Sequence, residues 1–114
     1  MLDWKDLRHG TAAQQQAHAA LEGLGIMDLL APHDPVLAGT FPLDLNIPGS
    51  DLDIVCAVYD TELFRHTLTN AYGHLPDFSV RSAVKHGLPA VICKFTYRGI
   101  PVEVFGQPLP SRQS

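Results

Sequence analysis

The sequence lacks long apolar runs, is poor in cysteine and has no excess of positive charge. No apolar stretch approaches the ~18 residues of a membrane-spanning helix, and the N-terminus lacks a basic region followed by an apolar one. We therefore expect a cytoplasmic protein with no membrane partner. The two cysteines, Cys56 and Cys93, lie in apolar runs without metal-ligand spacing, which favours buried thiols over a disulfide.

The charge balance and the histidine spacing argue against two further classes. Eight Lys and Arg residues against twelve Asp and Glu give a net charge of −4, the opposite of the basic surface that long nucleic acids select. A long duplex is therefore not an expected partner, and a small or locally presented acceptor fits better. The six histidines are scattered without ligand spacing, so no zinc site is predicted.

The length and the periodicity predict one compact domain over residues 1–107, followed by a polar tail over 108–114 that is either a true end or part of a longer chain. Helices are expected over 11–23 and 61–72, with a helical turn over 27–30, and Trp4 is expected to pack the first helix onto the body. After a short apolar run at Val36, strands are expected over 52–59, 78–85, 90–97 and 100–105, with a connection over 86–89 and a tight hairpin at Arg98-Gly99. The fold class is α/β (α+β): a mixed, largely antiparallel sheet of about five strands with two helices on one face.

Alternation along the expected strands sorts the side chains onto two faces of the sheet. Asp51 and Asp53 point to one side, and Leu52 and Ile54 point to the other. Val102 and Val104 join the core only if Glu103 shares the polar face with the two aspartates. The ordinary alternative is that Asp51 caps a turn and that the other two carboxylates are solvated strand residues.

The same alternation applies to the strands between the two carboxylate-bearing segments. Val80 and Val84 oppose Arg81 and Lys85, and Cys93 and Phe95 similarly oppose Lys94. The sequence therefore predicts one apolar face and one basic and polar face.

The carboxylate stretch resembles the signature of the DNA polymerase β-like nucleotidyltransferase superfamily. Gly39-Thr40 is followed by ten residues and then by Asp51-Leu52-Asp53, and the superfamily places a Gly-Ser or Gly-Thr pair about this far before an Asp-x-Asp strand. The resemblance covers Val36 to about Gln107. It is strongest to a family of small nucleotidyltransferase-like domains of uncharacterised function.

The resemblance implies a metal-dependent transfer of a nucleoside monophosphate from a nucleoside triphosphate to a hydroxyl. Asp51 and Asp53 would hold one Mg²⁺ or Mn²⁺, Asp53 and Glu103 would share a second, and Glu103 would accept the proton of the attacking hydroxyl. These three residues are the expected catalytic and metal-binding set.

Four other residues form the expected nucleotide-binding set. Gly39 permits close approach of the backbone to phosphates, and Thr40 donates its hydroxyl to them. Ser50 and Lys94 complete the set, with turn and cap hydrogen bonding as the alternative for Ser50 and solubilisation as the alternative for Lys94.

The departures from the superfamily pattern leave a second hypothesis open. Two prolines interrupt the segment F-P-L-D-L-N-I-P-G, where relatives have a helix, and the tail after Gln107 offers no helical lid. The chain is then either an enzyme or a catalytically inactive module that binds nucleotide or a partner protein, for example as an antitoxin-like partner. Because two helices cover only one face of five strands, the sequence also predicts either a homodimer or a longer chain.

Overall fold

The computed structural model describes residues 3–38 and 51–111 of the 114-residue chain. The predicted helices and strands are confirmed, with ends that shift by no more than two residues. In chain order the elements, with η for a 3-10 helix, are η1 (Trp4–His9), α1 (Ala12–Leu24), α2 (Ile26–Leu29), η2 (Ala31–His33), β1 (Val36–Leu37), β2 (Leu52–Ala57), α3 (Thr61–Tyr72), β3 (Ser79–Lys85), β4 (Leu88–Tyr97) and β5 (Ile100–Gln107).

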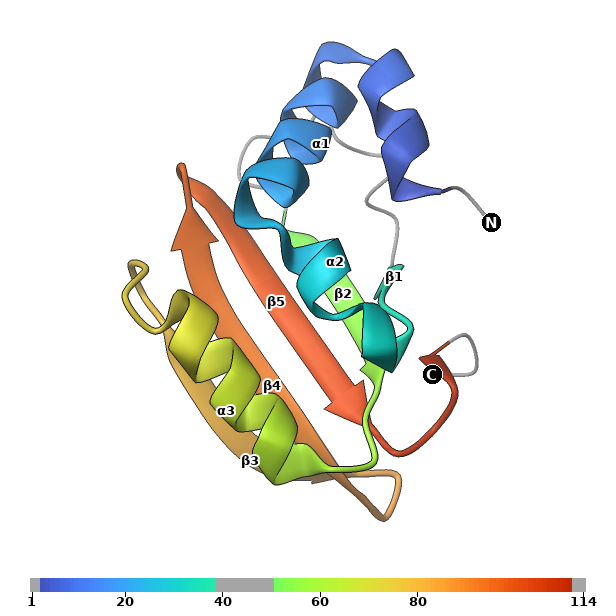
Figure 1. Cartoon of the computed structure of the whole chain (residues 1–114), viewed down its shortest axis with the longest axis vertical. Coiled ribbons are helices and arrows are strands. Elements are labelled where there is room, and N and C mark those ends of the chain that lie inside the picture. Colours follow the sequence, from blue (N-terminus) through green and yellow to red (C-terminus); the bar gives the residue numbers. More distant parts are fainter. Residues whose placement is uncertain (1–2, 39–50, 112–114) are drawn as a thin grey trace.

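Five strands of the described residues form one sheet in the order β1-β2-β5-β4-β3. The pair β2–β5 is parallel, and the other neighbouring pairs are antiparallel. The last strand of the chain therefore lies in the middle of the sheet, between β2 and β4 (Figure 1). The expected mixed, largely antiparallel sheet of an α+β fold is confirmed.

The helices lie on one face of this sheet, with α3 over β4 and α2 over β2 (Figure 1). Strand alternation explains which side chains meet them, because every second residue of a strand points to the same face. The covered face and the inner faces of the helices form one apolar core. Its largest fully buried side chains include Leu7, Leu21, Ile26, Leu30, Leu52, Ile54, Phe64, Leu68, Val91 and Phe95.

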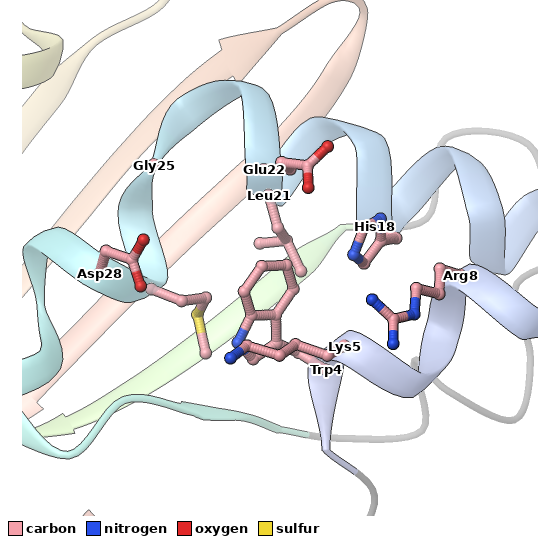
Figure 2. Close-up of a pocket in the computed structure, with 9 residues that line it drawn as sticks. Trp4, Lys5, Arg8, His18, Leu21, Glu22, Gly25 and Asp28 are labelled. Carbon is pink, nitrogen blue, oxygen red and sulfur yellow. The ribbon is translucent and has the colours of Figure 1, made fainter.

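The N-terminal helix η1 packs along α1. The Asp3 carboxylate caps η1 by accepting a hydrogen bond from the backbone N–H of Lys5 at 3.0 Å. Trp4 is partly buried against the core, and its ring stacks on His18 of α1 with 5.2 Å between the ring centroids (Figure 2). Trp4 therefore packs on the first predicted helix, as expected. It does so from a 3-10 helix, which the sequence of residues 1–10 did not predict.

Thr11 and Gly25 mark the two ends of α1. The Thr11 hydroxyl accepts a hydrogen bond from the Gln14 N–H at 3.1 Å, and the Gln14 side-chain oxygen accepts one from the Thr11 N–H at 2.9 Å. Gly25 ends the helix in the left-handed conformation with φ 63°. The Tyr72 hydroxyl then donates to the Leu24 carbonyl at 2.9 Å, which joins the end of α3 to the end of α1.

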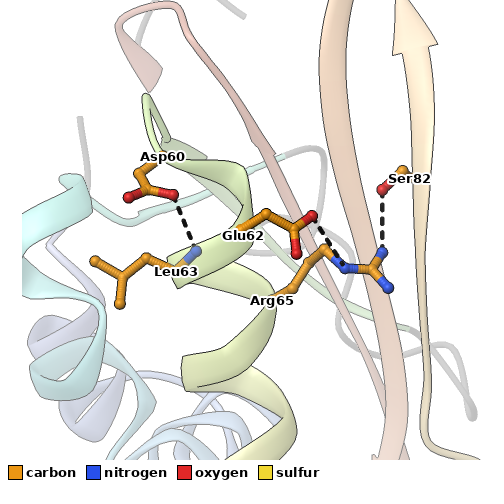
Figure 3. A network of polar contacts seen from close by, with 5 residues as sticks. All are labelled: Asp60, Glu62, Leu63, Arg65 and Ser82. Atoms are coloured by element: carbon orange, nitrogen blue, oxygen red, sulfur yellow. Dashed lines mark hydrogen bonds and ion pairs between the residues drawn. The ribbon is translucent and has the colours of Figure 1, made fainter.

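Polar contacts at the start of α3 hold the helix over the sheet (Figure 3). The Asp60 carboxylate caps it by accepting a hydrogen bond from the Leu63 N–H at 3.0 Å. The Arg65 guanidinium donates to the Ser82 hydroxyl of β3 at 3.1 Å and lies 4.0 Å from the Glu62 carboxylate. Since Ser82 belongs to the edge strand, this contact ties α3 to the far side of the sheet.

Two tight hairpins join β3 to β4 and β4 to β5. His86 and Gly87 have φ angles of 53° and 74°, and Arg98 and Gly99 have 51° and 79°. Positive φ at both central residues is the pattern of a type I′ turn, whose twist matches that of the flanking strands. The predicted Arg98-Gly99 hairpin is confirmed.

One expectation at the far end of β3 is wrong and one is confirmed. The sequence predicts a connection at Leu88 and Pro89, but these residues belong to β4 and pair with Lys85 and Val84. Val84 lies on the same face of the sheet as Val80, as predicted, yet it is 73% exposed. Because Val84 is the next-to-last residue of an edge strand, it has neighbours on one side only and stays in solvent.

The polar segment after β5 packs back onto the residues between η2 and β1. Ser111 is buried, and its hydroxyl donates to the backbone carbonyl of Asp34 at 2.7 Å. The same hydroxyl lies 3.1 Å from the Asp34 carboxylate. This contact fixes the residues that follow η2, where the chain turns into β1.

Candidate active site on the open face of the sheet

Asp53, Glu103 and Lys94 form one row across the sheet face that the helices leave open. Asp53 of β2 is the parallel register partner of Glu103 of β5, and Glu103 is in turn the antiparallel partner of Lys94 of β4. Paired residues on neighbouring strands point to the same face. Carboxylates that are 50 residues apart in the chain are thereby brought side by side, on the face where strand alternation predicted them.

Lys94 and Glu103 form an ion pair within this row. The Lys94 Nζ atom lies 3.5 Å from Glu103 Oε1, and the two side chains are 59% and 38% exposed. An ion pair at this exposure contributes about 0–1 kcal/mol to stability. The ion pair matters here for electrostatics, because it places the positive charge of Lys94 next to Glu103, the central residue of the row.

The pair was missed in the sequence, although one signal specifies it. The sequence analysis predicts a nucleotide-binding role for Lys94 and does not predict its contact with Glu103. A two-residue turn at Arg98-Gly99 makes Tyr97 and Ile100 partners, and counting outward from them leads to Lys94 opposite Glu103. The hairpin rule was therefore sufficient to predict this contact.

Within the row, Asp53 has a carboxyl group whose pKa is raised by its surroundings. Burial raises the pKa of its carboxyl above the ordinary value, and the negative charges of Glu103 and then Asp51 raise it further. Asp51 lies just before β2 and is exposed, and its negative charge is the smallest of the three causes that raise the pKa of Asp53. The row thus concentrates negative charge that a cation would neutralise.

The other predicted site residues, Gly39, Thr40 and Ser50, lie outside the described residues. Lys94 is described and stands on the predicted face, where it pairs with Glu103. The structure therefore brings together one predicted nucleotide-binding residue and the predicted carboxylates.

The carboxylates of the row are suitable ligands for a divalent metal ion that is also bound by the phosphates of a substrate. Over residues 3–38 and 51–111, no group of three or more His, Cys, Asp or Glu side chains forms a cage ready to hold a metal ion. Mg²⁺ is commonly bound by one or two carboxylates, with substrate phosphates and water as the remaining ligands. Asp53 and Glu103, with Asp51 within electrostatic reach, supply oxygen donors of that kind.

An apolar row runs beside the charged one on the open face. Val55, Phe105 and Ile92 are register partners on β2, β5 and β4, each two residues from a member of the charged row. Val55 and Phe105 are partly exposed. The prediction that this face is only basic and polar was wrong, because in a continuous apolar run strand alternation does not show which residues leave the core.

Residues 19–114 match a family model. The chain belongs to the DUF4269 family. This family is described as a domain of unknown function, so membership assigns no activity. A comparison with curated proteins returns no match.

One solved structure shares the fold, and its title reads "Structure and function of the polymerase core of TRAMP, a RNA surveillance complex". The TM-score is 0.50 at 20% sequence identity, over 85% of the DUF4269 chain and 32% of the other chain. This likeness confirms the nucleotidyltransferase-like fold. The DUF4269 chain therefore spans about a third of the length of the chain that it matches.

Within residues 3–38 and 51–111, no helix is both long enough and apolar enough to cross a membrane.

Proposed function

We propose that this DUF4269 chain is a nucleotidyltransferase domain that moves a nucleoside monophosphate from a nucleoside triphosphate to a hydroxyl acceptor with two divalent metal ions. The observation that supports this most is the register of β2 and β5, which sets Asp53 beside Glu103 on an open sheet face. The fold shared with a polymerase core is consistent with it.

Each carboxylate has a role in the proposed reaction. Asp51 and Asp53 would bind one Mg²⁺ or Mn²⁺, and Asp53 and Glu103 would bind the other. When bound, the metals neutralise phosphate charge and lower the pKa of the attacking hydroxyl. Glu103 accepts the hydroxyl proton while the acceptor oxygen bonds to the α-phosphorus and the bond to the bridging oxygen breaks, releasing pyrophosphate.

Lys94 and the segment before β2 complete the proposed site. If Glu103 ligates a metal, the Lys94 ammonium that now pairs with it would be available to bind a phosphate oxygen of the nucleotide. Gly39, Thr40 and Ser50 belong to the same proposal as phosphate-binding residues, on the strength of their sequence pattern.

The Lys94–Glu103 pair also favours a second candidate function. A carboxylate already neutralised by a lysine suits a degenerate site that binds nucleotide, or a regulatory or antitoxin-like partner, without turnover. The two candidates make opposite predictions about product formation.

Incubation with Mg²⁺, each labelled nucleoside triphosphate and a cell extract separates them. If the chain is an enzyme, the label should be transferred to a small molecule, protein or RNA end. The substitutions Asp53→Asn and Glu103→Gln should each abolish this transfer. Glu62→Gln on α3 is the matched control, since it removes one exposed negative charge far from the row. Nucleotide binding that depends on Asp53, without any labelled product, would support the inactive module instead.

A further inference from the structure

The strand β3 forms an outer edge of the sheet, and among the described residues it has a neighbouring strand on one side only (Figure 1). Each of its seven residues pairs with one residue of β4, so no bulge interrupts it, and it contains no proline. The opposite edge is β1, which is only two residues long. Of the two edges, β3 is therefore the one that is long and regular enough to accept a further strand.

The unpaired backbone groups of β3 belong to every second residue. The N–H of Thr96 in β4 donates to the Pro76 carbonyl at 2.9 Å, so the backbone groups of Thr96 point to the β3 side. Because these groups alternate along an antiparallel strand, the β3 residues opposite every second residue counted back from Thr96 bond to β4. Pro89, which has no N–H, is the partner of Val84 and agrees with this alternation. The residues whose N–H and C=O groups face outward are Val80, Ser82 and Val84.

The side chains along this edge are exposed on both faces of the sheet. On the face that carries α3, Arg65 reaches Ser82 (Figure 3), but Val84 is 73% exposed. On the open face, Arg81 and Lys85 are both exposed, and neither forms an ion pair with a carboxylate of the described residues within 4.0 Å. A strand laid along β3 would therefore meet an uncovered valine and two cations that have no acidic partner.

The two cations make a second copy of this chain a poor occupant of the edge. Two β3 strands related by a two-fold axis would pair antiparallel with their open faces on the same side. Centred on Ala83, this pairing sets Arg81 of each copy opposite Lys85 of the other, and centred on Ser82 it makes the two Arg81 side chains diagonal neighbours. Like charges across neighbouring strands are destabilising. The strand that fits this edge carries carboxylates instead.

We propose that the outer edge of β3 binds an extended acidic segment of a partner protein as an added strand of the sheet. The backbone of the segment pairs with the three outward-facing residues. Two carboxylates four residues apart lie opposite Arg81 and Lys85, and an apolar side chain between them covers Val84. Strand alternation fixes this pattern, because the positions opposite Arg81 and Lys85 share one face and the position opposite Val84 lies on the other. The surface is independent of the proposed reaction, whose carboxylates lie on and just before β2 and on β5.

The acetylated peptide amide T-E-V-T-V-E-T is a suitable probe, because it carries the required pattern in either strand direction. Titration of a fluorescently labelled copy with the full chain should saturate at about 0.1–1 mM, as measured by anisotropy. The peptide T-K-V-T-V-K-T should bind at least about tenfold more weakly, since two attractions become two repulsions. The peptide T-V-E-T-E-V-T has the same composition but sets its glutamates two residues apart, and it should bind about fivefold more weakly because only one of them meets a cation.

Two sets of substitutions separate the contribution of charge from that of the backbone. Arg81→Glu combined with Lys85→Glu should reverse the preference, so that the lysine peptide binds at least about tenfold more tightly than the glutamate peptide. Val84→Pro removes one outward N–H without removing a bond to β4, and it should weaken the glutamate peptide about fivefold. Val84→Thr is the matched control, since it keeps the N–H and the branched side chain.

Far-ultraviolet circular dichroism verifies that each variant folds. The charge reversal changes exposed side chains only, so it decides the question even if the proline variant does not fold.

Amide hydrogen exchange gives a readout that is specific for the position of the added strand. The glutamate peptide should slow exchange at Val80, Ser82 and Val84 but not at Arg81 and Ala83, whose N–H groups already face β4. The proposal is overturned if about 5 mM peptide slows none of the first three. It is equally overturned if the lysine peptide binds the parent chain as well as the glutamate peptide does. Equal binding by the Val84→Pro and Val84→Thr chains would also overturn it, because charge alone would then account for binding.

Discussion

Lys94 of β4 and Glu103 of β5 face each other across an antiparallel pair of strands, with 3.5 Å between the ammonium nitrogen and the carboxylate oxygen. Asp53 stands on the other side of Glu103. The lysine is therefore a cation of the protein's own on the side of Glu103 that faces away from Asp53, whereas a metal ion shared by the two carboxylates would lie between them. Any metal that binds Glu103 must share it with Lys94 or displace it.

Replacing Lys94 with methionine should tighten the binding of Mn²⁺ in the absence of nucleotide. The substitution removes a like charge next to the metal, worth about 1 kcal/mol at this exposure, so a roughly fivefold gain in affinity is expected by calorimetry. Lys85→Met, at the exposed end of β3, is the matched control and should leave the affinity unchanged. A Lys94→Met chain that binds Mn²⁺ no better than its parent would show that the ion pair does not compete with metal.

Asp53→Asn should raise the melting temperature at pH 7. Burial, Glu103 and Asp51 raise the pKa of Asp53 in the folded state, so ionising this carboxyl opposes folding. That cost is absent below the unfolded pKa of about 4 and grows as the pH rises through the raised folded value. The stability gain of the variant should therefore be present at pH 7 and vanish near pH 3, as measured by thermal unfolding. A gain that is equal at both values would exclude the electrostatic cause.

Val102→Asp and Glu103→Gln test the two faces of β5 with adjacent residues. Val102 is 2% exposed and packs in the core, so a carboxylate there should unfold the domain at a cost of several kcal/mol. Glu103→Gln loses only a surface ion pair and should cost about 1 kcal/mol or less. Urea denaturation compares them, and equal losses would contradict the assignment of faces.

Gly106→Ala should weaken the packing of α3 on the sheet. A Cβ atom at this position would lie 2.5 Å from a Val58 methyl carbon and 2.9 Å from a ring carbon of Phe64, both of them buried. Such overpacking typically costs about 1–3 kcal/mol, and denaturant unfolding measures it. Gly99→Ala is a poor control because its φ of 79° adds strain, whereas Ser79→Ala changes an exposed position of an edge strand and should be neutral.

Much of the fold follows from local signals that the sequence displays. Thr11 and Asp60 mark helix starts because their side chains cap backbone N–H groups, and Arg98-Gly99 specifies a turn because both residues take positive φ. The face of Glu103 follows from its place between Val102 and Val104. These features depend on a few neighbouring residues, which is why they were predictable.

The features that were missed depend on contacts between distant segments or on context at an edge. Val84 has the side chain of a core residue, but its place near the end of the edge strand leaves it exposed. The apolar row of Val55, Phe105 and Ile92 depends on which face the helices cover. The hydroxyl of Ser111 contacts the carbonyl of Asp34, which lies 77 residues earlier in the chain. None of these relations has a local sequence pattern.

Because β5 lies in the centre of the sheet, the sheet cannot form until the last strand has been synthesised. A chain emerges from the ribosome N-terminus first, so β2 and the β3–β4 hairpin are synthesised before the strand that joins them. Until residues 100–107 have emerged, the two halves have no common sheet and Asp53 has no carboxylate beside it. A nascent chain that stops short of β5 should therefore show local helix but no cooperative unfolding, and its charged row should not exist until the sheet closes.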